Sequence, residues 1–208
     1  MRFGLLLYDG VEPIDLAAFG VLSMARRIRP EIALATLAER AGPVTLANGI
    51  VVLAEHALAE APPLDWLVVP GGPGWVAAAE APAIHDFLRA QAARGPIASI
   101  CTGAMILAAS GLLDRRPATT KREVVPPEES PLHRLAAAYP TVTAREAVYV
   151  DSGAIVTGGG VALAIDTMLH VLARAFGEAV AAETARILEY DRARAANRAA
   201  LPPVIQSD

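Results

Sequence analysis

Short apolar runs alternate with helical segments along most of this chain, and turn residues close each run. Residues 3–8, 66–69 and 97–100 are runs of this kind, with the length of fully buried strands. Segments with apolar residues at helical spacing stand between and after them, such as 82–93 and 162–176. Strands that alternate with helices predict an α/β fold, a mostly parallel sheet covered by helices on both faces. Ligands of such sheets bind beyond the carboxyl ends of the strands.

The remaining segments fit the same arrangement. Residues 45–53 contain Asn48-Gly49, a pair typical of a hairpin turn. Residues 15–28 predict a helix after the first strand. No linker or internal repeat is evident, so we expect one domain over residues 1–190. Residues 191–208 are rich in Ala and Arg and then in Pro, which predicts a helical extension with a loose tail.

Composition and charge narrow the class of protein. The chain has 208 residues, of which 54% are hydrophobic, enough for one large core without disulfides. A single cysteine excludes an internal disulfide framework and a CxxC metal site, and it fits the reducing cytoplasm. The net charge of −4 argues against nonspecific nucleic-acid binding. No stretch approaches the roughly 20 apolar residues of a membrane span, and no secretory signal is visible. We therefore expect neither nucleic acid nor membrane as a partner.

Cys101, the single cysteine, stands at the turn from a buried strand into an Ala/Leu/Met-rich helix that Gly111 ends. Unpaired amides and the helix dipole at such a position favour an anion. They predict a thiol pKa below its free value of about 8.5, as a nucleophile needs. The alternative is a small buried hydrophobe, the usual role of a lone cysteine. The turn alone leaves both interpretations open.

Asp15 is the acidic residue that we expect beside Cys101. It precedes an apolar helix, a position typical of an N-cap. Alternatively, the loop after the first strand brings Asp15 to the Cys101 turn, where burial and a neighbouring thiolate would raise the pKa of the carboxyl. A protonated Asp15 would then donate a hydrogen bond to the sulfur, or act as acid and later as base. Thr102 offers a hydroxyl that could orient either group.

Two glycine-rich turns follow strands at the same predicted edge, at residues 71–74 and 158–160. Backbone amides of Gly71, Gly72, Gly158 and Gly159 can face a ligand there and form an oxyanion pocket, although a tight turn is the simpler interpretation. Neither turn has the spacing of a dinucleotide or phosphate loop. The four histidines are scattered, so the residues favour neither a Cys–His pair nor a metal site.

Several motifs occur in a specific order. They are YDGVEPIDL (8–16), VPGG (69–72), SICTGA (99–104), RPATT (116–120), TGGG (157–160) and LEY (188–190). This ordered set resembles the ThiJ/PfpI superfamily, and the Cys-Thr-Gly turn and first-loop aspartate resemble its isocyanide hydratase branch. Members of that branch usually continue Ala-Thr-Thr with His-Trp, where this chain has Lys121-Arg122.

The resemblance implies a single-domain flavodoxin-like sandwich, related to the class I glutamine amidotransferase domain, with Cys101 on a strained nucleophile elbow. It implies a homodimer. It assigns the acidic partner to Asp15 and the neighbouring hydroxyl to Thr102. It also implies that Gly72 and a backbone amide near Cys101 line an anion pocket.

The activity implied by the resemblance is hydration of a small-molecule isocyanide without a cofactor. The Cys101 thiolate attacks the terminal carbon, Asp15 guides protons and water, and a thioimidate gives an N-formamide. Two alternatives stay open. One is glyoxalase- or deglycase-like activity on reactive carbonyls, and the other is a non-enzymatic redox or ligand-sensing domain.

Overall fold

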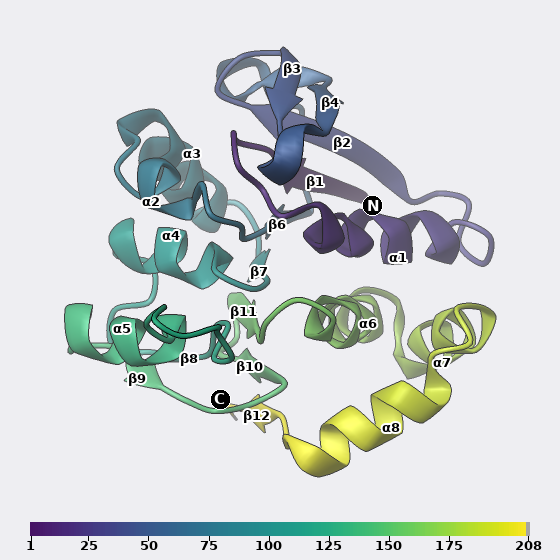
Figure 1. Cartoon of the computed structure of the whole chain (residues 1–208). Coiled ribbons are helices and arrows are strands. Elements are labelled where there is room, and N and C mark those ends of the chain that lie inside the picture. Colours follow the sequence, from purple (N-terminus) through teal and green to yellow (C-terminus); the bar gives the residue numbers. More distant parts are fainter. Residues whose placement is uncertain (207–208) are drawn as a thin grey trace.

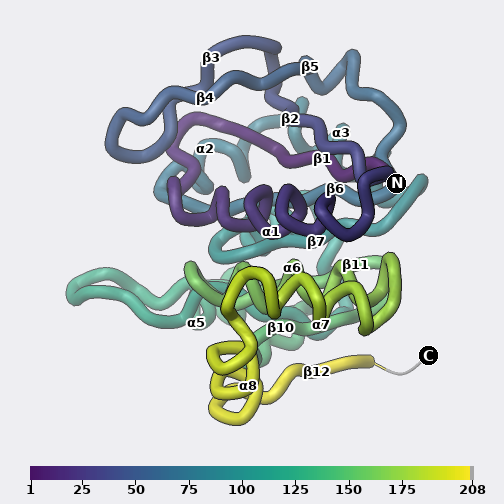
Figure 2. Tube along the Cα trace, turned by 90° about the vertical axis from the view of Figure 1, so that its right-hand side faces the viewer, coloured from purple at the N-terminus to yellow at the C-terminus, as the bar shows by residue number. Residues whose placement is uncertain are grey.

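The computed structural model describes residues 1–206, which form an eight-stranded sheet between layers of helices (Figures 1 and 2). Neighbouring strands are parallel except β10 and β11, so β10 and its parallel neighbour β12 run opposite to the other six strands. In spatial order the strands are β12 (Val204–Ile205), β10 (Tyr149–Asp151), β11 (Ile155–Gly158), β7 (Ile97–Ser99), β6 (Trp66–Val69), β1 (Arg2–Leu6), β2 (Ala33–Ala38) and β5 (His56–Ala57).

Two small sheets lie outside the main one. The predicted hairpin at residues 45–53 is confirmed, because residues 42–45 pair antiparallel with residues 51–54. Asn48 and Gly49 in its turn have φ of 62° and 90°, the left-handed region that these residue types favour. The two small sheets are β3 (Gly42–Thr45) with β4 (Val51–Ala54), joined through η2 (Ala47–Gly49), and β8 (Pro117–Ala118) with β9 (Thr143–Ala144).

The helices form two layers (Figure 1). Helices α1, α6 and α7 pack on one another over one face of the sheet, and α2, α3 and α4 lie over the other. Within residues 1–206, every helix is too short or too polar to cross a membrane. The helices are η1 (Pro13–Leu16), α1 (Ala17–Ala25), η3 (Leu58–Glu60), α2 (Trp75–Ala78), α3 (Pro82–Ala92), α4 (Gly103–Ala109), α5 (Pro131–Ala138), α6 (Leu163–Phe176), α7 (Glu178–Ile187) and α8 (Asp191–Ala200).

The central strands carry the core, as their apolar sequences predict. Every residue of β6, β7 and β11 is buried, because both faces of these strands are covered. The predicted α/β fold with a mostly parallel sheet is therefore confirmed. Because β1, β6, β7 and β11 are mutually parallel, their carboxyl ends meet at one edge. That edge brings together the turns 7–16, 70–74, 100–102 and 159–162.

The predicted polar helix after residue 190 is present as α8. The expectation of a loose tail is wrong for residues 204–206, and residues 207–208 lie outside the described residues. Val204 pairs with Val150, and the N–H of Gln206 donates to the Asp151 carbonyl at 2.8 Å. The tail thus adds β12 to the open side of β10. An unpaired strand edge carries free N–H and C=O groups, and pairing satisfies them.

A buried carboxylate ties the C-terminal helices to α6. Asp166 is fully buried, and its Oδ2 accepts hydrogen bonds from the Tyr190 hydroxyl and the Asn197 amide, both at 2.8 Å. The Asn197 amide also donates to the Tyr190 hydroxyl at 3.0 Å. Burial raises the pKa of Asp166, and these two donors lower it. Tyr190 and Asn197 therefore make a buried charge tolerable.

Replacing Tyr190 by Phe removes one donor to Asp166 and keeps the ring. We expect the free energy of unfolding to fall by about 1–3 kcal/mol, the usual cost of leaving a buried acceptor short of a partner. Urea denaturation measures this loss. Tyr139→Phe is the control, since burial and the charge of Arg134 act on the Tyr139 hydroxyl and no hydrogen bond to it is found among the described residues. Equal losses in the two variants would contradict the role of Tyr190.

Candidate active site

Cys101 lies between β7 and α4, at the strand-to-helix turn that the sequence predicts. Its φ is 50°, a left-handed conformation that is uncommon for a residue with a Cβ. Its N–H donates to the Gly159 carbonyl at 3.0 Å, and its carbonyl accepts the Thr120 hydroxyl at 2.7 Å. Strain of this kind costs on the order of 1–3 kcal/mol and persists only where the surroundings hold it. Cys101 is thus on a strained elbow.

Close packing against the end of β6 explains the glycines around the elbow. A Cβ on Gly103 would lie 2.1 Å from the Val69 carbonyl oxygen. A Cβ on Gly71 would lie 2.3 Å from the Thr102 nitrogen and 2.9 Å from Cβ of Cys101. No side chain fits at such distances. The glycines therefore allow the 70–74 turn to lie directly against Cys101.

Asp15 does reach this edge of the sheet. It belongs to η1 and is fully buried, and its Oδ2 accepts the N–H of Gly71 at 2.7 Å. Its Oδ1 is buried and accepts no N–H or O–H among the described residues. The side chain caps neither η1 nor α1, so the N-cap interpretation is wrong. Glu12 and Leu16 occupy the cap positions, and the Asp15 carboxyl faces the sheet edge instead.

The carboxyl and the thiol are coupled. Burial is the main reason that the pKa of Asp15 is raised to about 6. The charge of Glu12 also raises this pKa, whereas the Gly71 N–H, a hydrogen bond with the Cys101 thiol and the charge of Lys121 lower it. The direction agrees with the sequence prediction, but the thiol acts as a hydrogen-bond partner and not as a repelling anion.

The thiol pKa contradicts the sequence prediction. It is raised to about 11, first by burial and then by the negative charge of Asp15. The N–H groups of Val161 and Thr102 and the charge of Lys121 lower it without outweighing these causes. The helix start does supply an amide, but the loss of water disfavours the anion more. Burial and the neighbouring carboxyl therefore disfavour the thiolate form of Cys101.

Thr102 contributes through its backbone more than through its hydroxyl. The hydroxyl oxygen accepts the Gly72 N–H at 2.9 Å and also lies 3.4 Å from the Gly72 carbonyl. It thus binds the 70–74 turn and orients neither the sulfur nor the Asp15 carboxyl. Because the N–H groups of Gly71 and Gly72 already donate to Asp15 and Thr102, these glycines build the site wall. Anion binding by them stays a prediction.

The turn after β11 supplies an amide that sequence reasoning missed. Gly159 donates its N–H to the Val148 carbonyl at 2.9 Å, and a Cβ on Gly158 would lie 2.2 Å from Oγ1 of Thr167. The Gly159 N–H is therefore used in a backbone hydrogen bond, and Gly158 is required by close packing. The N–H that faces the thiol belongs to Val161, whose φ of 50° is strained for a β-branched residue. The residue type does not reveal where a backbone amide points. The glycine-rich turn was therefore the only sequence signal for the Val161 amide.

Tyr8 is a further neighbour that the sequence motif contained without a role. Its hydroxyl is buried and donates to the Pro70 carbonyl at 2.8 Å. Burial raises its pKa well above the ordinary value, and the charges of Asp15 and Cys101 raise it further. Tyr8 therefore stays protonated and lies near enough for the charges of Asp15 and Cys101 to act on it.

The histidines lie elsewhere. None is among the groups that shift the pKa of Cys101. His85 contacts the Ala79 carbonyl at 2.9 Å, and His170 pairs with Asp151 at 2.7 Å. Within residues 1–206, His, Cys, Asp and Glu side chains form no group of three that could hold a metal ion. The chemistry available at Cys101 is therefore that of a thiol, a carboxyl and backbone amides.

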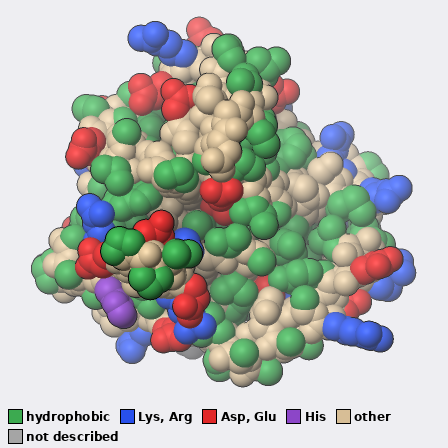
Figure 3. All heavy atoms as spheres, in the orientation of Figure 1, with side chains coloured by type: hydrophobic (Ala, Val, Ile, Leu, Met, Phe, Trp, Pro, Cys, Tyr) green, Lys and Arg blue, Asp and Glu red, His purple; other side chains and the backbone are tan. Residues whose placement is uncertain are grey.

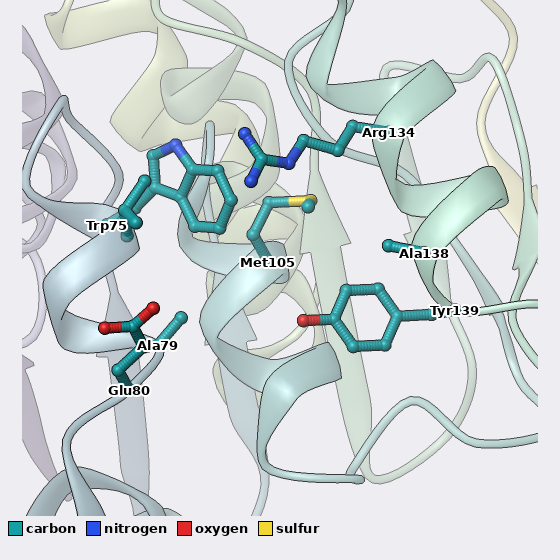
Figure 4. Close-up of a pocket in the computed structure, with 8 residues that line it drawn as sticks. Trp75, Ala79, Glu80, Met105, Arg134, Ala138 and Tyr139 are labelled. Atoms are coloured by element: carbon teal, nitrogen blue, oxygen red, sulfur yellow. The ribbon is translucent and has the colours of Figure 1, made fainter.

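A cavity of about 150 Å³ lies between α2, α4 and α5 (Figure 4). Trp75 follows the 70–74 turn, and Met105 lies one helical turn beyond Cys101 on α4. The Arg134 guanidinium lies over the Trp75 ring, 4.9 Å from its centroid. Neither Cys101 nor Asp15 lines this cavity. The cavity lies next to the Cys101 site, and the elements that follow the 70–74 turn and Cys101 line it.

Comparison with known proteins agrees with the motifs. The model of the DJ-1/PfpI family matches residues 1–174. An isonitrile hydratase from Pseudomonas putida is 30% identical over 191 residues, which cover 91% of this chain and 76% of that protein. The family contains enzymes of this kind.

Solved structures show the same fold. A ThiJ/PfpI family protein from Pseudomonas syringae has a TM-score of 0.79 at 26% identity, covering 91% of this chain and 75% of that one. A cysteine-to-alanine mutant of a DJ-1 superfamily protein from Salmonella typhimurium has a TM-score of 0.77 at 28% identity, covering 91% and 98%. The resemblance inferred from the motifs is confirmed, and the chain belongs to the DJ-1/PfpI family.

Proposed function

We propose that this protein is a cysteine-dependent hydratase that adds water to a small isocyanide and releases an N-formamide. The pairing of Cys101 with Asp15 carries this proposal, because the two buried groups shift each other's pKa and Oδ1 of Asp15 accepts no N–H or O–H among residues 1–206. A buried acceptor without a partner is a place where substrate or water belongs. The similarity to the Pseudomonas putida isonitrile hydratase supports the same chemistry, since isonitrile and isocyanide name one functional group.

The protonation states define the role of Asp15. With a thiol pKa of about 11 and a carboxyl pKa of about 6, the resting site holds a thiol beside a carboxylate. Asp15 therefore acts as a general base that takes the thiol proton as the sulfur attacks. The N–H groups of Val161 and Thr102 stabilise the negative sulfur as it forms. No standing thiolate is needed.

The reaction balances with one water. The Cys101 sulfur bonds to the terminal isocyanide carbon, and the thiol proton passes through Asp15 to that carbon, which gives a thioimidate. Water then adds to the same carbon, and its first proton passes through Asp15 to the nitrogen. The adduct breaks its C–S bond, the hydroxyl proton returns to the sulfur, and the N-formamide leaves. Because water is the only reactant besides the isocyanide, we propose that no cofactor takes part.

The burial of Cys101 favours a substrate with a narrow reactive end. Cys101 is only 3% exposed, so a reactive atom has to approach end-on. An isocyanide ends in a linear, unbranched N≡C group that fits this approach. Glyoxalase- or deglycase-like chemistry requires a trigonal carbonyl carbon at the same sulfur, and no histidine acts on Cys101 to serve it.

The redox-sensing alternative has less support from this geometry. Oxidation of cysteine proceeds from the thiolate, and the raised thiol pKa disfavours that form. Ready conversion of Cys101 to a sulfinic acid by dilute peroxide, seen as a mass increase of the intact chain, would favour the sensor instead.

We also propose that a second copy of the chain is a partner. The β3–β4 hairpin exposes large apolar side chains, namely Ile50 at 52%, Val51 at 58% and Leu53 at 69%. Hydrophobic side chains gather on the surface over these strands (Figure 3). A cluster of this kind on one exposed element is typical of an interface.

The activity prediction concerns both members of the pair. Cys101→Ala removes the nucleophile and should abolish formamide production. Asp15→Asn should lower kcat/KM by about 10²–10⁴-fold, the usual contribution of a general base. The wild-type kcat/KM should rise with pH through about 6 as Asp15 ionises, and this limb should vanish in Asp15→Asn.

Formamide release, followed by NMR, measures these rates. Asp86→Asn is the control, since its carboxylate lies on the surface of α3 with 81% of the side chain exposed. Clean wild-type protein that hydrates neither alkyl nor aryl isocyanides would overturn the hydratase proposal.

Ionisation of Asp15 should raise the activity but lower the free energy of unfolding. Because the pKa of Asp15 is raised from 3.8 to about 6, the folded chain binds this proton more tightly than the unfolded chain. The Asp15 carboxyl contributes up to about 3 kcal/mol to the free energy of unfolding below about pH 4. This contribution is lost as the pH rises from about 4 to 6. Asp15→Asn should therefore unfold at higher urea than wild type near pH 8, with the difference shrinking toward pH 4. A variant that is less stable than wild type near pH 8 would contradict a buried carboxylate.

The oligomer prediction uses the exposed hairpin. Leu53→Glu places a charge in the proposed interface, so the variant should sediment as one chain where the wild type sediments as two. Val125→Glu is the control, since Val125 is 73% exposed on a different segment. A wild-type chain that stays monomeric at every concentration would refute the dimer.

A further inference from the structure

The only lysine of the chain stands beside the only cysteine. Lysines and arginines number 18 together, and Lys121 is the single lysine among them. It directly follows Thr120, whose hydroxyl donates to the Cys101 carbonyl at 2.7 Å. Its charge lowers the pKa of both Asp15 and Cys101. One ammonium group therefore acts on both reacting groups of the proposed mechanism.

Packing holds the Lys121 stem at the edge of the site. A Cβ on Gly160 would lie 3.0 Å from Cγ and 3.2 Å from Cβ of Lys121. Gly160 precedes Val161, whose N–H faces the thiol. The carbonyl of Lys121 accepts the N–H of Leu132 at 3.0 Å, at the start of α5. The residue is thus fixed between the turn after β8, the turn after β11 and α5.

The charge of Lys121 has no carboxylate partner in the described part of the chain. Its Nζ donates to the backbone carbonyl of Glu123, which is neutral. The neighbouring Arg122 instead pairs with the side chains of Glu123 and Glu146. Of these two adjacent cations, one is neutralised by surface carboxylates, and the other keeps its net charge because it bonds only to a backbone carbonyl.

We propose that Lys121 is a specificity-determining residue that binds a carboxylate of the substrate. This inference rests on the proposed function and deepens it: the preferred isocyanide carries an acidic group a few bonds from the reactive carbon. An ammonium group on a flexible stem is a compact point charge that can meet such a group. The Coulomb attraction is stronger here than at an open surface, because the neighbouring thiol and carboxyl are buried and the effective dielectric is lower.

Alkylation of Cys101 tests this without any isocyanide. Iodoacetate and iodoacetamide both form an S–C bond to the sulfur and release iodide, and they differ in whether a carboxylate or a neutral amide follows. The ratio of the two rates cancels the fraction of reactive thiolate. Because the chain has one cysteine, intact mass follows a single event.

We expect Lys121→Met to lower the iodoacetate-to-iodoacetamide rate ratio by about 5–10-fold, as loss of one close charge contact in a partly buried site implies. Lys121→Arg should keep most of the wild-type ratio. Arg122→Met is the matched control, because it removes the adjacent charge that carboxylates already neutralise, and it should leave the ratio unchanged.

Two outcomes overturn the proposal. If Lys121→Met slows both reagents equally, Lys121 acts on the thiol alone and does not select a carboxylate. If Arg122→Met lowers the ratio as much as Lys121→Met, the selectivity comes from the overall positive charge of this surface and not from Lys121.

Turnover gives the second readout. For wild type, isocyanoacetate should exceed its methyl ester in kcat/KM, and Lys121→Met should reverse or remove that order. A chain that hydrates neither compound refutes the proposed function, while the alkylation ratio still decides the role of Lys121. A chain that hydrates both compounds equally in both forms refutes the role of Lys121 alone.

Discussion

The left-handed backbone of Cys101 is the constraint on which the site depends. A φ of 50° at this residue turns the chain sharply from β7 into α4 and leaves the side chain at the sheet edge. The turn fits only because Gly71 and Gly103 have no Cβ there. Backbone bonds to Gly159 and Thr120 then hold it. One strained residue thereby fixes the positions of the turns after β6, β7, β8 and β11.

Burial decides how such a thiol can work. An exposed cysteine at a helix start gains a lowered pKa from the helix amides, but here the loss of water and the charge of Asp15 outweigh them. The same burial raises the pKa of Asp15, so the two groups are suited to share one proton. The site thus avoids a standing thiolate, which is the form that oxidants attack, and keeps a base next to the sulfur.

The sequence pattern predicted elements whose cause is local and missed those whose cause is tertiary. Residues 66–69 and 82–93 were predictable because apolar periodicity follows burial, and β6 and α3 match them closely. The approach of Asp15 to the Cys101 turn was predicted from the loop and the resemblance, but its hydrogen bond to Gly71, which lies far away in sequence, was not. Strand β12 has two residues and no periodicity, and only the open side of β10 explains it. Val161 acts through its amide, which no residue type reveals.

The C-terminal extension is connected to the site through the same turn that carries Val161. Tyr190, at the junction of α7 and α8, lies with its hydroxyl 3.4 Å from the Ala162 carbonyl and 2.8 Å from Asp166. Ala162 directly follows Val161, whose strained φ of 50° has to be held by neighbouring structure. The Tyr190 hydroxyl, which Asp166 also binds, contacts this turn at the Ala162 carbonyl. Asn197 of α8 completes the same group of hydrogen bonds, so the extension after residue 190 packs on the helix that follows the Val161 turn.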